Sequence, residues 1–131
     1  MTAAKKKIRI LIAEDERDIR DLINITLGFA GYEVIPTNNG EEAYQAALRE
    51  IPDLILLDVR MPRMTGYEVC KLLKEQESTQ KIPVIFLSAK GQESEVKTGL
   101  EVGAEEYILK PFSPDELVTR IEAILKSKHK K

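Results

Sequence analysis

Short apolar runs alternate with longer amphipathic segments along this sequence, and that alternation restricts the fold more than any other feature. The runs occupy residues 8–13, 32–36, 53–58, 84–89 and 107–110. Their short length, β-branched residues and nearly continuous apolarity predict parallel strands that are buried on both faces of a sheet. Because parallel strands require crossover connections, the segments between the runs should be helices.

Helical periodicity is present in the segments that follow the runs. Apolar residues recur at helical spacing within residues 19–30, 43–48, 69–73, 96–103 and 117–125. The last helix has the clearest start, because Ser113 can cap it, Pro114 suits its first turn and Glu116 can close a capping box. Strands and helices in this alternation predict an α/β fold of the flavodoxin-like (βα)5 type. Its five-stranded parallel sheet should have the strand order 2-1-3-4-5, with helices on both faces.

Size, charge and cysteine content exclude several classes of protein. The chain has 131 residues, and its 20 basic residues nearly balance 22 acidic ones, so its charge gives no reason to expect nucleic-acid binding. Cys70 is the only cysteine, which excludes an internal disulfide and fits a reducing compartment. The first apolar run is soon broken by Glu14 and Asp15, unlike a signal peptide, and no stretch is long enough to span a membrane. We therefore expect a cytoplasmic protein that does not enter a membrane.

Polar residues stand at the carboxyl ends of four of the predicted strands. Glu14 and Asp15 follow the first strand, Asp58 ends the third, Ser88 lies near the end of the fourth, and Lys110 ends the fifth. In an open parallel sheet, ligands bind at these ends, near the point where the strand order reverses. The order 2-1-3-4-5 places the first and third strands side by side, so Asp15 and Asp58 should converge.

The chemistry of these side chains points to phosphoryl transfer. Clustered carboxylates repel one another unless a cation joins them, and oxygen ligands with room for water suit Mg²⁺ better than Ca²⁺. Lys110 adds a positive charge and Ser88 a hydroxyl donor, which together describe a phosphoryl site with Asp58 as nucleophile and an aspartyl-phosphate as product. Taken singly, Asp15 or Ser88 could cap a helix and Lys110 could be a surface charge. Their joint occurrence at the ends of one sheet favours the site.

Four segments together resemble the receiver domain of two-component response regulators, the chemotaxis-Y-like group. They are LIAEDE, LILLDVRMPRMTG, IFLSAK and GAEEYILKPF, in the family's order and spacing. On this basis we expect an N-terminal extension over residues 1–6, the receiver domain over 7–126 and a basic C-terminal tail over 127–131. The resemblance implies phosphorelay signalling, in which a histidine kinase or phosphotransfer protein phosphorylates Asp58 with Mg²⁺. The domain would then act on a downstream protein or a fused effector, and it would not be an enzyme with a separate substrate.

The resemblance also implies roles for the residues at the strand ends. Asp15 is expected to bind Mg²⁺ directly beside Asp58, and Glu14 to bind it through water. Ser88 and Lys110 are expected to contact the phosphoryl group. The acidic pair departs from the family, where two aspartates are common, because Glu14 is longer than aspartate by one methylene.

Three further residues have roles implied by the resemblance. Arg60 is expected to offer its backbone carbonyl to the metal. Arg60 and Lys90 also stand at positions that vary in the family and tune the lifetime of the phosphoryl group, and long cations at both positions predict slow dephosphorylation. Tyr107 stands where the family has its switch aromatic. With Ser88, it is expected to transmit phosphorylation to the face formed by the fourth helix, the fifth strand and the fifth helix.

That same face carries charges of both signs. Glu101, Glu105 and Glu106 precede or begin the fifth strand, and Arg120 lies on the fifth helix. Acids on one element and a base on the next suit a two-fold pairing in which each charge meets its opposite. The sequence therefore suggests a phosphorylation-dependent homodimer through this face, against the alternative of an ordinary solvated surface.

Three other classes of protein remain as alternatives. A Mg²⁺-dependent phosphohydrolase on a similar α/β fold would also use Asp58 as a nucleophile, but Arg60 stands where its D-x-D pattern has a second acid. A flavin or nucleotide binder needs a loop rich in Ser, Thr and Gly after the first strand, where this chain has AEDE. A degenerate receiver used only for docking is disfavoured by the intact set of Asp58, Asp15 and Lys110.

Overall fold

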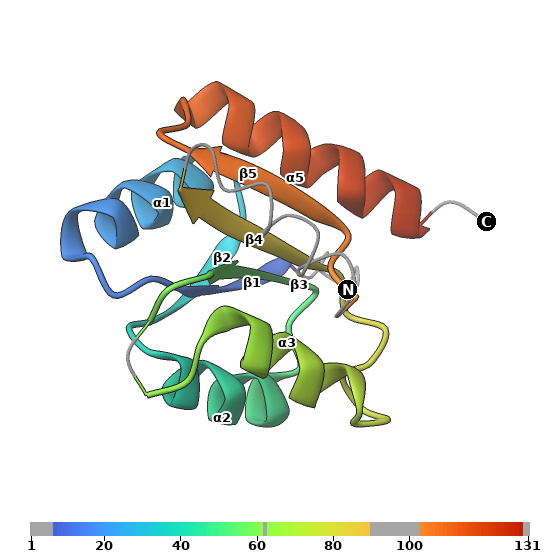
Figure 1. Cartoon of the computed structure of the whole chain (residues 1–131). Coiled ribbons are helices and arrows are strands. Elements are labelled where there is room, and N and C mark those ends of the chain that lie inside the picture. Colours follow the sequence, from blue (N-terminus) through green and yellow to red (C-terminus); the bar gives the residue numbers. More distant parts are fainter. Residues whose placement is uncertain (1–6, 62, 90–102, 130–131) are drawn as a thin grey trace.

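The computed structural model describes residues 7–61, 63–89 and 103–129. Its centre is a parallel sheet of five strands in the order β2-β1-β3-β4-β5 (Figure 1). The strands are β1 (Arg9–Ala13), β2 (Glu33–Thr37), β3 (Leu54–Asp58), β4 (Val84–Ala89) and β5 (Glu106–Lys110). The predicted flavodoxin-like order is confirmed, and each strand begins and ends within one residue of its predicted bounds.

Helices cover both faces of the sheet. In Figure 1, α1 (Arg17–Phe29) and α5 (Pro114–His129) lie on one face, and α2 (Gly40–Glu50) and α3 (Gly66–Lys74) on the other. Because successive strand residues point to opposite faces, Ile10 of β1 belongs to the core beneath α1 and α5, and Leu11 to the core beneath α2 and α3. All five residues of the middle strand β3 are buried, which explains its unbroken apolar run.

Local side-chain chemistry sets where several helices begin and end. Thr65 and Glu68 form a reciprocal capping box at the start of α3. The predicted cap of α5 is present, since the Ser113 hydroxyl accepts a hydrogen bond from the Glu116 N–H at 3.1 Å. Gly31, just past the end of α1, has a φ of +98°, a left-handed conformation that glycine adopts without a steric penalty.

One predicted helix is not tested, and two other helices differ in detail from the predictions. The helix predicted within residues 96–103 falls almost wholly outside the described residues and stays a prediction. The last helix extends to His129, past residue 126, whereas the domain bounds themselves stay a prediction. Leu22, which the periodicity places on the apolar stripe, is 42% exposed, whereas Ile23 and Leu27 are fully buried.

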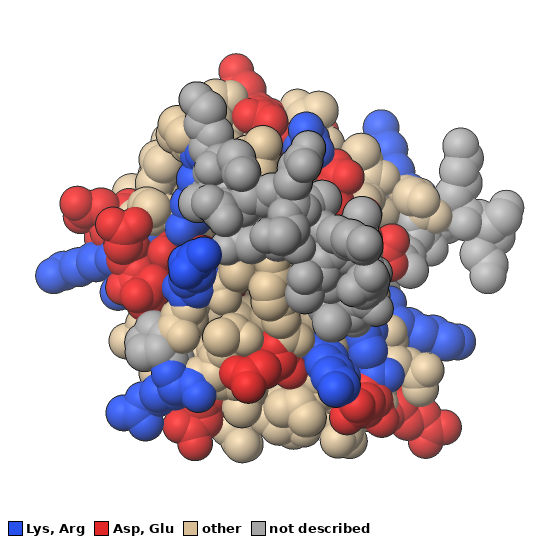
Figure 2. Space-filling model, viewed as in Figure 1, with Lys and Arg blue, Asp and Glu red and all other residues tan. Residues whose placement is uncertain are grey.

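The surface is mixed in charge. Figure 2 shows Lys and Arg interspersed with Asp and Glu over the visible face, without a broad area of one sign. None of the helices in the described part of the chain has the length and apolarity that crossing a membrane requires.

Candidate functional site

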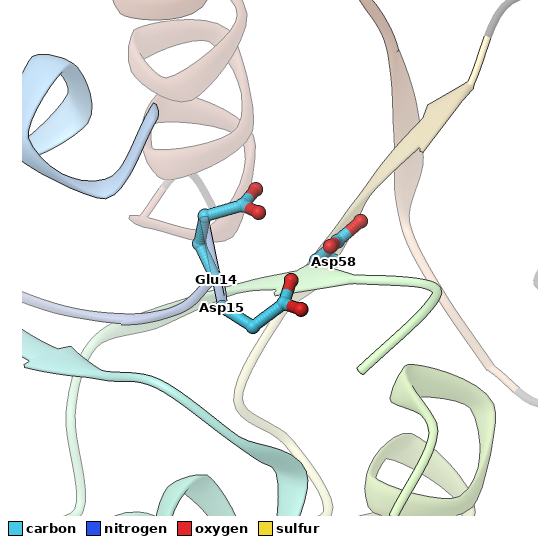
Figure 3. Close-up of side chains that lie close together, drawn as sticks. All are labelled: Glu14, Asp15 and Asp58. Carbon is cyan, nitrogen blue, oxygen red and sulfur yellow. The ribbon is translucent and has the colours of Figure 1, made fainter. Parts of the chain in front are cut away.

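Three carboxylates meet at the carboxyl end of the sheet. Glu14 and Asp15 directly follow β1, and Asp58 is the last residue of β3. The register pairs Ala13 with Leu57, so the next residues along both strands become neighbours. Each carboxylate offers an oxygen within 4.8 Å of the others, and Figure 3 shows the three groups facing one another. The predicted convergence of Asp15 and Asp58 is therefore present, with Glu14 beside them.

Lys110 reaches this cluster from β5. Its Nζ atom lies 3.1 Å from Asp58 Oδ1, where it donates a hydrogen bond, and 3.1 Å from Glu14 Oε1. The contact with Glu14 is an ion pair without hydrogen-bond geometry, because that oxygen lacks a hydrogen-bond partner among the described residues. One ammonium group thus forms ion pairs with two carboxylates, but it donates a hydrogen bond only to Asp58.

Backbone contacts hold Glu14 in a buried position. Its N–H donates to the Thr37 carbonyl at 3.1 Å, and its own carbonyl accepts from the Arg20 guanidinium at 2.9 Å. Its Oε2 atom accepts a weak bond from the Glu16 N–H at 3.2 Å. The Glu14 residue is fully buried, whereas the adjacent Asp15 is exposed. The acidic pair therefore has one member inside the protein and one at its surface.

The shared burial raises carboxylate pKa values at the site. Burial, and next the charge of Asp58, raise the pKa of Glu14 to about 7 against the opposing effect of Lys110. Burial also raises the pKa of Asp58, with Lys110 again opposing. Burial alone would lower the pKa of Lys110, but the negative charges of Asp58 and Glu14 outweigh it and raise that pKa. The cluster thus carries more negative charge than Lys110 neutralises.

These groups fit a hard divalent cation. The buried Glu14 oxygen is not satisfied by hydrogen bonding, and the neighbouring oxygens of Asp15 and Asp58 are close enough to share an ion with it. Carboxylate oxygens are ligands that Mg²⁺ and Ca²⁺ both accept, and a few protein ligands with water completing the shell suit Mg²⁺. The donor set therefore matches the predicted metal.

The loop after β3 is packed tightly against Asp58. At Gly66, the first residue of α3, a Cβ atom would come within 2.4 Å of the Asp58 carbonyl oxygen. At Gly40 on α2, a Cβ would lie 1.9 Å from the Met64 carbonyl oxygen, so the loop is also pressed onto the start of α2. The second contact was not predicted from the sequence, because nothing in the sequence pairs Gly40 with Met64.

Of the remaining predicted residues, Ser88 and Arg60 lie near the same edge, whereas Tyr107 lies near the amino end of β5. Ser88 is buried near the end of β4, one residue past Leu87, which is the register partner of Asp58. Tyr107 is half-buried on β5. Arg60 is exposed just beyond β3, and Lys90 lies outside the described residues.

One contact beside the site was not anticipated. The hydroxyl oxygen of Tyr67, at the start of α3, lies 3.1 Å from the hydroxyl oxygen of Tyr107. These residues are 40 positions apart, and the only signal in the sequence is the tyrosine that follows Gly66. The first turn of α3 therefore contacts the predicted switch residue.

Sequence comparisons identify the same kind of domain. The model of the response regulator receiver domain family matches residues 10–122. The phosphate regulon transcriptional regulatory protein PhoB of Pseudomonas aeruginosa PAO1 is 48% identical over 117 residues, which are 89% of this chain and 51% of that protein. The chain thus spans about half the length of the curated relatives it matches.

Solved structures agree with the sequence matches. The chemotaxis response regulator CheY4 of Vibrio cholerae has a TM-score of 0.86 and 32% identity, and the match covers 91% of this chain and 99% of that one. The receiver domain of a sensor histidine kinase from Pseudomonas aeruginosa PAO1, with a magnesium ion in its active site cleft, also has a TM-score of 0.86. It is 29% identical, over 92% of this chain and 99% of that one.

These relatives give no support to the phosphohydrolase interpretation. The two solved structures share instead the overall fold found here. The chain therefore belongs to the family of response regulator receiver domains, which are the phosphoacceptor domains of two-component signalling.

Proposed function

We propose that Asp58 is the residue of this receiver domain that accepts the phosphoryl group. The observation that carries the proposal is the place of its carboxylate, which is nearly buried at the end of the middle strand, bonded to Lys110 and adjacent to Glu14 and Asp15. A strand with neighbours on both sides holds the nucleophile at a fixed distance from groups that neutralise charge, and such preorganisation lowers the barrier.

The neighbouring residues then have separate tasks. A carboxylate oxygen of Asp58 attacks the phosphorus atom of the donor, and the donor's own bond to phosphorus breaks. Lys110 already donates a hydrogen bond to the attacking carboxylate, so its ammonium can stabilise the charge that builds on the phosphoryl oxygens. Ser88, on the adjacent strand, donates its hydroxyl to one of those oxygens. The domain turns over no substrate other than its own phosphoryl group.

We infer that Mg²⁺ is held by Asp15 and Asp58, by Glu14 through water, and by the backbone carbonyl of Arg60. The unsatisfied Glu14 oxygen and the closeness of the three carboxylates support this assignment, as does the magnesium in the related receiver from Pseudomonas aeruginosa. When bound, the ion supplies positive charge to the carboxylates and to the transferring oxygens.

Acetyl phosphate labelling tests both assignments. The protein should gain one phosphoryl group in the presence of Mg²⁺, as read by intact mass spectrometry, and none after EDTA treatment. Asp58→Asn should abolish the gain, whereas Asp53→Asn, at the opposite end of the same strand region, should keep it. Labelling of Asp58→Asn, or labelling without metal, would exclude Asp58 or Mg²⁺ from these roles.

The switch is proposed to run through Ser88 and Tyr107. Recruitment of the Ser88 hydroxyl to the phosphoryl group vacates space beside β4, next to the strand that carries Tyr107. An amphipathic tyrosine can change its orientation at modest cost. Ser88→Ala should therefore accept the phosphoryl group but lose the NMR shift changes around Tyr107 that beryllofluoride causes. Wild-type shift changes in that variant would rule out a route through the hydroxyl.

Arg60 and Lys90 are proposed to lengthen the lifetime of the phosphoryl group. Long cations beside the site can pair with phosphoryl oxygens and hinder the approach of a hydrolytic water. Arg60→Asn should accelerate dephosphorylation in a phosphate-release assay. Arg63→Asn is the matched control, because Arg63 is exposed in the same loop but pairs with Glu41 at 3.4 Å. Equal rates in wild type and Arg60→Asn would contradict the proposal.

Partners follow from the family. We propose that a histidine kinase or phosphotransfer protein in the cytoplasm donates the phosphoryl group and that a downstream protein or a fused effector reads it. The homodimer remains a proposal, and the structure weakens its electrostatic basis. Arg120 pairs within the chain, at 2.7 Å from Glu106 and 3.6 Å from Glu116, so a dimer would exchange these pairs rather than add new ones. Light scattering with Mg²⁺ and beryllofluoride tests it, and a monomer at high concentration would refute it.

A further inference from the structure

Two tyrosine hydroxyls meet beside the phosphoacceptor strand. The Tyr67 and Tyr107 oxygens are 3.1 Å apart, and either can be the donor. Both side chains are half-buried, so water competes less for this bond than it does at an exposed site. The bond joins the first turn of α3 to β5.

The buried ring of Phe86 packs against both tyrosine rings. The Phe86 ring centroid lies 5.2 Å from that of Tyr67 in an edge-on arrangement and 5.5 Å from that of Tyr107 in a tilted one. Phe86 is fully buried on β4 and is the register partner of Tyr107 on β5. Aromatic contacts at these separations are favourable, so the ring limits where each tyrosine can place its hydroxyl.

The backbone just before Tyr67 touches the phosphoacceptor itself. A Cβ on Gly66 would lie 2.4 Å from the Asp58 carbonyl oxygen and 3.2 Å from the Phe86 ring. The Gly66 N–H also donates to the Val59 carbonyl at 3.0 Å. The end of β3 and the start of α3 are therefore closely packed, with one residue, Gly66, between this contact and Tyr67.

We propose that Tyr67 is a positioning residue of the switch: its hydroxyl holds Tyr107 in the orientation that accompanies a free Asp58 carboxylate. This structure shows Asp58 without a phosphoryl group, with its carboxylate hydrogen-bonded to Lys110. The proposal rests on the proposed function, in which a phosphoryl group on Asp58 favours the other orientation of Tyr107. The bond between the two hydroxyls stabilises only the orientation of Tyr107 that accompanies free Asp58. Loss of the bond therefore favours the other orientation, and it strengthens binding of a phosphoryl group at Asp58 to the extent that the orientation equilibrium shifts.

The test is the Tyr67→Phe variant, which keeps the aromatic ring and removes only the hydroxyl. The apparent Kd for beryllofluoride at saturating Mg²⁺, measured by NMR titration, should fall by roughly threefold to tenfold, the change expected for one neutral hydrogen bond. Tyr44→Phe is the matched control, because it also removes one hydrogen-bonded tyrosine hydroxyl, which here accepts from Gln76 at 3.4 Å. Its Kd should equal that of the wild type.

A double-mutant cycle separates positioning from simple packing. In a Tyr107→Phe background, Tyr67→Phe should no longer change the Kd, because the bond is already absent. An unchanged or higher Kd in Tyr67→Phe, or the same fall with and without the Tyr107 hydroxyl, overturns the inference. Failure of the wild type to bind beryllofluoride, or to be phosphorylated at Asp58, would instead overturn the proposed function on which the inference rests.

Discussion

Both ends of the sheet carry a cluster of charged side chains, but only at the amino end do opposite charges compensate one another. At the amino end, the Arg9 guanidinium contacts Glu33 and Glu50, and the Arg9 N–H donates to Asp53 at 2.8 Å. At the carboxyl end, three carboxylates lie together, Lys110 pairs with two of them, and among the described residues a buried Glu14 oxygen has no hydrogen-bond partner. The two ends of one sheet therefore differ in how fully their charged groups are compensated.

The carboxylate pKa values record the difference. At the amino end, hydrogen bonds from Arg9 and then Arg49 lower the pKa of Glu50. At the carboxyl end, burial and the charge of Asp58 raise the pKa of Glu14 to about 7. A charged Glu50 is thus favoured by folding, whereas a charged Glu14 is opposed by it. Charge that folding leaves uncompensated is available for a ligand cation, which is why perturbed pKa values gather at functional sites.

Replacing the cation at each end of the sheet should give the largest difference in the free energy of unfolding. Lys110→Met leaves Glu14 and Asp58 without their ammonium, and we expect the free energy of unfolding at pH 8, without Mg²⁺, to fall by about 3 to 4 kcal/mol. Arg9→Met removes partly exposed pairs and should cost only about 1 kcal/mol. Urea unfolding followed by circular dichroism measures both. An equal or larger loss in Arg9→Met would show that the two ends do not differ in this way.

Neutralising a carboxylate at each end should change stability with opposite signs. Because the pKa of Glu14 is raised from 4.5 to about 7, the folded state retains a proton that the unfolded state loses, and stability falls as the pH rises between these values. Glu14→Gln should remove this loss of stability. At pH 8 without Mg²⁺, its free energy of unfolding should exceed that of the wild type by up to about 3 kcal/mol.

Glu50→Gln is the matched control at the amino end. Because the pKa of Glu50 is lowered in the folded state, its contribution is present above the unfolded pKa and is lost as the pH falls through the folded pKa. This variant should therefore be less stable than wild type at neutral pH. The measurement is thermal unfolding of both variants from pH 4 to pH 8, and stability changes of the same sign would contradict the comparison.

Mg²⁺ should stabilise the protein through the carboxyl end alone. At a hundredfold excess over its Kd, the ion should add about 2.7 kcal/mol to the free energy of unfolding. Asp15→Asn should lose most of that gain while costing little itself, because Asp15 is exposed. Asp53→Asn, at the amino end, should keep it. Isothermal titration and urea unfolding with and without Mg²⁺ test this, and undiminished stabilisation of Asp15→Asn would remove Asp15 from the metal site.

Salt should produce the smallest effect. Half-exposed pairs are screened more than buried ones, so added NaCl should reduce the roughly 1 kcal/mol cost of Arg9→Met. The cost of Lys110→Met should respond less, since both of its carboxylate partners are buried. Repeating the urea titrations at low and high NaCl measures this, and an equal salt response would place both ends in the same dielectric environment.

Much of the fold was predictable because it depends on local patterns. The run at residues 84–89 coincides with β4, and Ser113 caps the last helix as its spacing to Glu116 suggests. The meeting of Asp15 and Asp58 needed only one further step, the general rule for strand order in an open parallel sheet.

Other features could not be predicted, because they depend on which distant groups come into contact. Glu14 and Asp15 are adjacent acids in the sequence, yet one is fully buried and the other exposed. That asymmetry follows from how the chain enters α1 and from the Thr37 carbonyl that fixes the Glu14 N–H. Likewise, Arg120 finds its acidic partners within the chain, although its sequence position suits pairing between chains equally well.

The order of the elements, the sheet edge at which the polar residues gather and the chemistry they offer all follow from the amino-acid sequence. Three features follow only from the packed chain: which carboxylate has an oxygen without a hydrogen bond, how Lys110 is shared, and the contact between Tyr67 and Tyr107. The physical reason is range. Strand and helix periodicities act over a few residues, whereas burial, ion pairing and side-chain hydrogen bonds depend on packing between segments far apart in the chain.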